Sequence, residues 1–236
     1  MKKILITGAH SYIGTSVADY LARWPEKYAV DTLSVRGEDW KQADFSKYDA
    51  VFHVAGIAHA DVGHVSEERK AEYYAVNRDL TLAVAEKAKA DGVGQFLYMS
   101  SAIVYGDSAP IGKRKVITKD TPVAPANFYG DSKVQAEKGL KKLESDAFRV
   151  AVLRPPMIYG PGSKGNYPTL SKMARKLPLF PKVDNQRSML YVENLAECVR
   201  LLIEQGIGGI FWPQNREYSN TSQLVALIAK AHGKHI

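Results

Sequence analysis

Three side chains in the middle of the chain have the types and spacing needed for proton transfer to or from an alcohol. Tyr129 and Lys133 lie four residues apart in FYGDSKVQAEKGL, so a helix would place them on one face. An ammonium group beside a phenol lowers the phenol pKa from its reference value of about 10. A shift to near 7 needs about 4 kcal/mol of differential stabilisation of the phenolate. Ser101 follows the strand-like segment FLYM, and a hydroxyl at the end of a parallel strand points into the ligand-binding crevice. The three residues predict acid–base chemistry on a hydroxyl group.

A glycine-containing turn near the N-terminus predicts a binding site for a dinucleotide. The motif TGAHSYIG lies between the strand-like KKILIT and a helix-like segment. The start of such a helix, at Tyr12 and Ile13, presents backbone N–H groups and a positive dipole end to a pyrophosphate. Gly8 would allow the tight turn, and Gly14 would allow close packing of helix and strand. Ser11 stands where a middle glycine is usual, so we expect a slightly looser approach of the backbone to the phosphate.

The rest of the chain alternates between strand-like and helix-like segments, which is typical of a parallel sheet covered by helices on both faces. We therefore predict an α/β protein with a doubly wound, mostly parallel Rossmann sheet in residues 1–160. Residues 161–236 are expected to form a small, incomplete substrate-covering region, some of whose elements return to the main domain. The predicted strands are 2–7, 28–35, 49–56, 94–101 and 149–156, and the predicted helices are 15–24, 71–92 and 135–146.

Composition excludes several other classes of protein. The formal net charge is +7 among 236 residues, but the basic residues are scattered, with one tight cluster at 113–115, so we expect no nucleic-acid partner. No apolar stretch approaches the ~18 residues of a membrane span, and we expect no membrane association. The single cysteine, Cys198, rules out an internal disulfide and favours a reducing compartment, so a cytoplasmic location is predicted. No metal site is expected.

These motifs occur in the order, and at roughly the separations, of the extended short-chain dehydrogenase/reductase family, the NAD-dependent epimerase/dehydratase group. The chain resembles that family from residue 1 to about 230. The segment DAVFHVAG resembles the strand whose end, at Ala55 and Gly56, lies along the cofactor. Asn77 in YYAVNRDLT matches the family's asparagine, and LRPPMIYGP, which contains Pro156, resembles the loop that covers the nicotinamide. RSMLYVENLA resembles the segment whose arginine, here Arg187, holds a sugar nucleotide's diphosphate.

The resemblance implies a role for each matching residue. Ser101 would orient the substrate hydroxyl, Tyr129 would act as general acid and base, and Lys133 would tune Tyr129 and bind the nicotinamide ribose. Asn77 would support the helix that carries the active site. Arg187 would pair with the substrate's diphosphate, for which a guanidinium fork is well suited. Asn166, in GSKGNYP, is a weaker candidate for substrate binding.

The cofactor positions depart from the family's usual pattern. Members that use NAD usually have an acidic residue at the end of the second strand, where it bonds the ribose 2′-hydroxyl. Here Ser34 occupies that position and Arg36 follows two residues later, a pair that suits a 2′-phosphate, so the cofactor is NAD or NADP with NADP slightly favoured. With a register shifted by a residue or two, Asp31 or Asp39 could still fill the role. The pair Asp44–Phe45 resembles the family's pair that contacts adenine. Only about ten residues separate it from the second strand, so we expect the third strand and its helix to be abbreviated.

The segment after the active-site strand narrows the reaction. Sugar 4,6-dehydratases of the family have an Asp-Glu pair where this chain has Ala102-Ile103, so the acid and base needed to eliminate water are missing. The segment SSAIVYG instead resembles UDP-galactose 4-epimerases and related ketoreductases. The leading expectation is a nucleotide-sugar epimerase that acts at C4 through a keto intermediate. The alternatives are a nucleotide-sugar 4-ketoreductase and a non-catalytic dinucleotide sensor, and a homodimer is compatible with each.

Overall fold

The computed structural model describes residues 1–58, 65–110 and 113–234. Its centre is a six-stranded sheet in the order β2-β1-β3-β4-β5-β8, in which every neighbouring pair is parallel. Strand β1 lies between β2 on one side and β3 on the other, and the later strands continue beyond β3, so the strand order reverses at β1. Ligands of such sheets bind outside the carboxyl ends of the strands at this point. The strands are β1 Lys2–Thr7, β2 Tyr28–Leu33, β3 Ala50–His53, β4 Gln95–Met99, β5 Arg149–Leu153 and β8 Gly209–Phe211.

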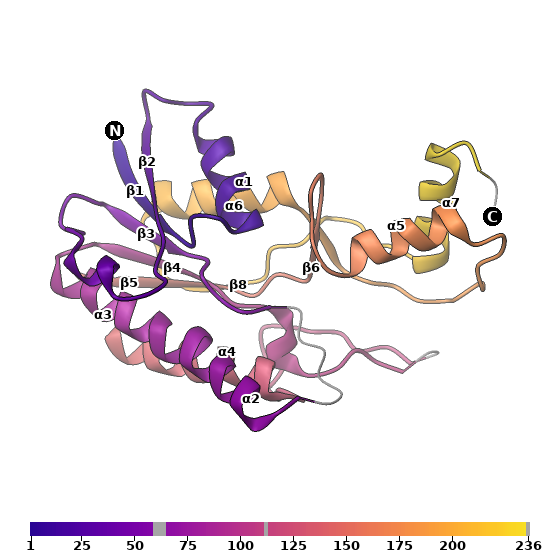
Figure 1. Cartoon of the computed structure of the whole chain (residues 1–236), viewed down its shortest axis with the longest axis horizontal. Coiled ribbons are helices and arrows are strands. Elements are labelled where there is room, and N and C mark those ends of the chain that lie inside the picture. The colour runs from indigo at the N-terminus through magenta and orange to yellow at the C-terminus, as the bar shows by residue number, and fades with distance from the viewer. Residues whose placement is uncertain (59–64, 111–112, 235–236) are drawn as a thin grey trace.

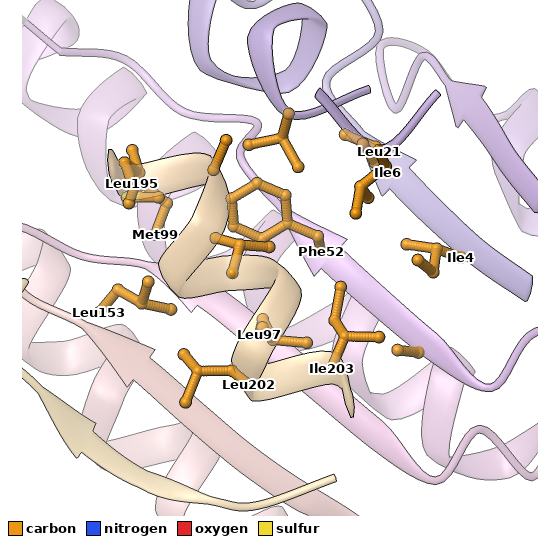
Figure 2. Packing of buried hydrophobic residues seen from close by; sticks show 14 of the residues in the cluster. Ile4, Ile6, Leu21, Phe52, Leu97, Met99, Leu153, Leu195, Leu202 and Ile203 are labelled. Atoms are coloured by element: carbon orange, nitrogen blue, oxygen red, sulfur yellow. The ribbon is translucent and has the colours of Figure 1, made fainter. Parts of the chain in front are cut away.

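Helices cover both faces of this sheet, which confirms the predicted doubly wound fold (Figure 1). On one face lie α1 and α6, and on the other lie α3 and α4. Successive side chains of a strand point to opposite faces, so Ile4 and Ile6 pack under α1 and α6 while Leu5 packs on the other side. Figure 2 shows Leu202 and Ile203 of α6 over the sheet. The helices are α1 Tyr12–Leu21, α3 Thr81–Ala90, α4 Phe128–Leu143 and α6 Val192–Gln205.

Several elements differ from the sequence prediction in their bounds. The helix predicted at 71–92 is divided into α2 Glu67–Tyr74, the π-helix η2 Ala75–Leu80 and α3. The helix predicted at 135–146 starts earlier, because the Asn127 side chain accepts a hydrogen bond of 3.0 Å from the Gly130 N–H and caps it. Between β2 and β3 the structure has only the 3₁₀ helix η1 Asp39–Gln42, so the abbreviation of this region is confirmed.

A smaller lobe extends from the carboxyl side of the sheet. Helices α5 Asn166–Lys176 and α7 Thr221–Ala231 pack together around Ala174, Val225 and Ala229, and Figure 1 shows them side by side at the end far from β1. A two-stranded parallel sheet of β6 Met157–Tyr159 and β7 Met189–Tyr191 leads into this lobe. The intervening α6 and β8 return to the main sheet. Over the described residues, no helix is both long and apolar enough to span a membrane.

Candidate active site

The turn after β1 brings backbone close to backbone in a way that only glycine allows. Gly8 has φ +102°, and a Cβ there would lie 2.9 Å from the Ala55 nitrogen at the end of β3. A Cβ on Gly14 would lie 2.6 Å from the Ser11 hydroxyl and 3.1 Å from a Val54 methyl group. The start of α1 therefore sits directly against the ends of β1 and β3. This cradle fits the pyrophosphate of a dinucleotide, because a helix N-terminus offers its unpaired N–H groups there.

Ser11 caps α1 with its own side chain. Its hydroxyl accepts a hydrogen bond of 2.9 Å from the Gly14 N–H, so it satisfies one of the free donors of the first turn. The N–H groups of Tyr12 and Ile13 have no partner four residues earlier inside the helix and are the donors left for a ligand. Ser11 therefore shapes the turn with its side chain, and we did not anticipate this role.

The end of β2 matches the register that we predicted. Leu33 is the last residue of the strand, and its carbonyl accepts a hydrogen bond of 3.0 Å from the Gly8 N–H. Ser34 is the next residue, and both Ser34 and Arg36 are exposed. Asp31 lies inside the strand, where its carboxylate accepts a 2.6 Å hydrogen bond from the Tyr48 hydroxyl. No carboxylate directly follows the strand, so this position suits a 2′-phosphate better than a free 2′-hydroxyl.

The pair Asp44–Phe45, which resembles an adenine-contacting motif, takes part in contacts within the protein. The Asp44 carboxylate closes a local turn, accepting hydrogen bonds of 2.8 and 2.6 Å from the N–H and hydroxyl of Ser46. These bonds lower the pKa of Asp44. The Phe45 ring is fully buried in the core under α3. The Phe45 N–H donates a 3.0 Å hydrogen bond to the Asp91 carboxylate, and an adenine contact by this pair stays a prediction.

Asn77 lies in the π-helix and joins the end of β3 to the helix that carries Tyr129. It is completely buried. Its amide oxygen accepts a 2.8 Å hydrogen bond from the Ile57 N–H, and its amide nitrogen donates to the Ile57 carbonyl and to the Ser132 hydroxyl. A Cβ on Gly56 would lie 3.0 Å from that amide oxygen. All of these bonds stay within the protein, so Asn77 shapes the cofactor-side loop and does not itself reach a ligand.

Ser101, Tyr129 and Lys133 meet where β4 ends beside α4. Ser101 directly precedes the 3₁₀ helix η3 Ala102–Tyr105 and accepts a hydrogen bond from the Ile103 N–H at 3.3 Å. Its hydroxyl also interacts with the Tyr129 phenol, an interaction that lowers the phenol pKa. Lys133 is 5% exposed, and its ammonium donates a 3.0 Å hydrogen bond to the Met99 carbonyl at the end of β4. The sequence spacing therefore does bring these side chains to one region.

The pKa of Tyr129 in the polypeptide differs from the lowered value that the sequence analysis predicts. Burial raises the pKa of Tyr129 to about 12, and this effect exceeds the opposing influence of Ser101. Burial lowers the pKa of Lys133 to about 8. The Lys133 ammonium is bonded to the Met99 carbonyl, and burial is the largest influence on the Tyr129 pKa. From the polypeptide alone, the Tyr129 phenol is therefore protonated at neutral pH. Formation of its phenolate needs additional positive charge nearby.

A buried histidine that we did not single out extends this site toward β1. His53, at the end of β3, is completely buried between Thr7 and Thr81, with its Nδ1 2.7 Å from one hydroxyl and its Nε2 3.1 Å from the other. The Thr81 hydroxyl donates to the Asn77 carbonyl at 2.9 Å, so it accepts from His53 Nε2–H and Thr7 donates to Nδ1. Burial lowers the pKa of His53 to about 3. The strand pattern alone could not reveal it, because a histidine in an apolar run has no distinctive spacing.

The two predicted substrate residues line one cavity in the smaller lobe. Arg187 and Asn166 border a cavity of about 330 Å³ between β6, α5 and α7, together with Met157, Asn185 and Thr221. Arg187 is exposed, and its backbone pairs with Ser219 through two hydrogen bonds of 2.9 Å. Pro156 directly precedes β6, on the path from the sheet to this cavity. Over residues 1–58, 65–110 and 113–234, no cluster of three or more histidine, cysteine or acidic side chains could hold a metal ion.

Comparison with known proteins agrees with this geometry. The chain is 30% identical to UDP-glucose 4-epimerase of Vibrio cholerae over 99% of its own length and 76% of that protein. It is 26% identical to GDP-6-deoxy-D-mannose reductase of Pseudomonas aeruginosa over 97% of its length and 79% of that protein. Among solved structures, UDP-glucuronic acid 4-epimerase from Bacillus cereus in complex with NAD has the same fold, with a TM-score of 0.81 and 21% identity over 98% of this chain and 83% of that one. The sequence pattern of the NAD dependent epimerase/dehydratase family matches residues 4–211, and the chain belongs to this family.

Proposed function

We propose that this protein is an NAD(P)-dependent nucleotide-sugar epimerase that inverts C4 of the sugar through a 4-keto intermediate. The observation that carries the proposal is the meeting of Ser101, Tyr129 and Lys133 at the end of β4. This group lies along the same sheet edge as the glycine cradle at Gly8. The similarity to the Vibrio cholerae epimerase supports the same reaction type.

Each catalytic side chain has a task that follows from its position. Ser101 would hydrogen-bond the C4 oxygen beside Tyr129. Tyr129 would take the proton of the C4 hydroxyl while the hydride leaves the carbon, and would return a proton after the keto sugar has turned its other face. When bound, the oxidised nicotinamide accepts the hydride, returns it, and supplies a positive charge that favours the Tyr129 phenolate. Lys133, held by the Met99 carbonyl, would contribute a second positive charge beneath the ribose.

The smaller lobe has the charge expected for an anionic substrate. Residues 161–190 and 213–236 carry nine lysines and arginines but only two acidic residues, Asp184 and Glu217. This excess equals the formal net charge of the whole chain, +7, so the rest of the protein is close to neutral. Arg187 and the cavity of about 330 Å³ lie in this positive lobe. A positive field around a cleft attracts anionic ligands, and the diphosphate of a nucleotide sugar fits that requirement.

A 4-ketoreductase is the second candidate, and the end of β2 favours it. Ser34 and exposed Arg36 suit NADP, and in a reductase the cofactor leaves after donating one hydride. A phenol whose pKa is about 12 also carries its proton at neutral pH, which is the form that reduction of a ketone requires. The sensor alternative is weaker, because Ser101, Tyr129 and Lys133 are all present.

The test is turnover of defined sugar nucleotides by the full chain. Incubation with UDP-glucose or UDP-galactose and catalytic NAD or NADP should equilibrate the C4 epimers, as resolved by chromatography. Tyr129→Phe should abolish this and leave dinucleotide affinity nearly unchanged, while the exposed Lys138→Met serves as the control. Consumption of stoichiometric NADPH with a 4-keto sugar, and no epimerisation, would instead assign the reductase. Mass spectrometry of nucleotides that co-purify with the protein would identify the sugar.

We also propose a cytoplasmic location, which is supported by the free thiol of Cys198, since thiols stay reduced in that compartment. A homodimer remains a prediction, which the molar mass in solution checks.

A further inference from the structure

A second functional feature of α4 is a buried carboxylate one turn beyond Lys133. Glu137 continues the face that carries Tyr129 and Lys133, because residues four apart in a helix lie on one side. The side chains of Glu137 and Arg154 are 9% and 7% exposed and form an ion pair. The Arg154 guanidinium binds both carboxylate oxygens, with Nε donating to Oε1 at 3.1 Å and Nη2 donating to Oε2. Neither residue was recognised from the sequence, since Arg154 is 17 residues away along the chain.

This pair connects four other elements to the catalytic helix. Ser100 is the residue before Ser101, and its hydroxyl donates a hydrogen bond to the Glu137 carboxylate. Arg154 directly follows β5 and donates at 2.6 Å to the Tyr105 hydroxyl in η3. The Trp212 indole, just after β8, donates to the same hydroxyl at 2.7 Å. The ends of β4, β5 and β8 and the segment that follows Ser101 thus converge on one carboxylate.

We propose that Glu137 is a positioning residue for the active site: it holds the end of β4 with Ser101 against α4, and its negative charge, one helical turn from Lys133, favours the ammonium form of that lysine. This inference rests on the proposed function, in which Ser101 and Lys133 act on substrate and cofactor. Glu137 itself touches neither and acts through them.

The charges around Lys133 show why a carboxylate is needed there. Among the residues that the structure describes, its neighbours include the Met99 carbonyl, the Tyr98 ring at 4.9 Å and neutral His53, none of which carries a charge. Burial lowers the pKa of Lys133 to about 8, and the charge of Glu137 opposes this effect. Without Glu137 the lysine would lose its proton at a lower pH, and with it the positive charge required near Tyr129.

A purely structural ion pair would behave differently under mutation. Removing one partner of a buried pair leaves an unpaired charge and strongly destabilises a protein, whereas replacing both partners is often neutral. The single variant Glu137→Gln retains an acceptor for Ser100 but leaves Arg154 unpaired. The double variant Glu137→Gln with Arg154→Met removes both charges and is expected to fold. It therefore separates stability from the effect on Lys133.

The experiment measures Lys133 directly and then turnover. The ε-carbon resonance of Lys133 is titrated by NMR in ¹³C-lysine-labelled protein, with the Lys133→Met spectrum as its assignment. We expect the wild-type midpoint near pH 8 and a midpoint lower by about one pH unit in the double variant. The alkaline limb of kcat/KM should move in the same direction, while the melting temperature of the double variant stays near that of the wild type.

Glu197→Gln is the matched control, because it removes a carboxylate from the Arg200 ion pair on α6, on the other face of the sheet. It should leave the Lys133 midpoint and the pH profile unchanged. Equal midpoints in the wild type and the double variant would overturn the inference. If the wild type turns over no sugar nucleotide, the proposed function fails, whereas the NMR titration still decides whether Glu137 controls the charge of Lys133.

Discussion

Because Lys133 is buried, the free-energy cost of its positive charge can be measured as a change in the free energy of unfolding. Lowering its pKa from 10.5 to about 8 corresponds to about 3 kcal/mol by which the folded protein disfavours the ammonium. Removing the Lys133 ammonium would also remove its 3.0 Å hydrogen bond to the Met99 carbonyl. The loss of this bond reduces the gain in stability by about 1 kcal/mol. The substitution Lys133→Met fills a similar volume, so we expect it to raise the free energy of unfolding by about 2 kcal/mol at pH 7.

The pH dependence of this gain follows from the direction of the pKa change. Between pH 8 and 10.5 the unfolded chain keeps the Lys133 proton while the folded chain loses it. Wild-type stability therefore rises with pH across that window. The advantage of Lys133→Met should be complete below pH 8 and should disappear by about pH 10.5.

Thermal unfolding followed by circular dichroism from pH 7 to 10 provides the assay. A gain of about 2 kcal/mol raises the melting temperature of a chain of this size by roughly 4–8 °C, and turnover should be lost. Lys138→Met removes an exposed lysine from the same helix and should show no such pH-dependent gain. A Lys133→Met protein that is less stable at pH 7, or whose difference from wild type does not vary with pH, would refute this reasoning.

Three further predictions concern the cofactor side of the molecule. His53 has a pKa of about 3 against 6.5, so it charges only on unfolding and about 5 kcal/mol of stability is lost as pH falls from 6.5 to 3. His53→Gln should flatten this decline in urea unfolding; an unchanged slope would contradict the buried neutral ring. Arg36→Ala should weaken NADP binding roughly tenfold and leave NAD binding unchanged, as measured by titration, whereas equal losses would contradict 2′-phosphate recognition. Gly14→Ala would place a Cβ 2.6 Å from the Ser11 hydroxyl and should lower both stability and dinucleotide affinity. Gly94→Ala is the control, because a Cβ there would lie 3.8 Å from its nearest neighbour. Equal losses in the two variants would show that the close contact at Gly14 does not matter.

Much of the scaffold was predictable because its signals are local. Strands buried on both faces appear as continuous apolar runs, so β1, β3, β4 and β5 were located correctly. The glycines at positions 8 and 14 stood out because backbone approach excludes a side chain there. The four-residue spacing of Tyr129 and Lys133 placed both on one helix face.

Local signals misled where burial decides the outcome. The motif at Asp44–Phe45 gave no indication that the phenyl ring packs into the core and that the carboxylate closes a turn with Ser46. The helix predicted at 71–92 is interrupted by a π-helix, in which Asn77 bonds both the loop after β3 and α4. Periodicity does not detect such an interruption, because the apolar pattern continues through it.

The sequence by itself determined the order of the elements and the glycine cradle, and it indicated the candidate catalytic side chains, since each depends on neighbours a few residues apart. Only the tertiary structure decided how these side chains ionise and what holds them. His53 finds the Thr7 hydroxyl 46 residues away, and Arg154 finds Glu137 from another strand end. A buried polar group must find a partner wherever the fold brings one, and desolvation sets its pKa. Both depend on which distant segments surround it, which no local pattern contains.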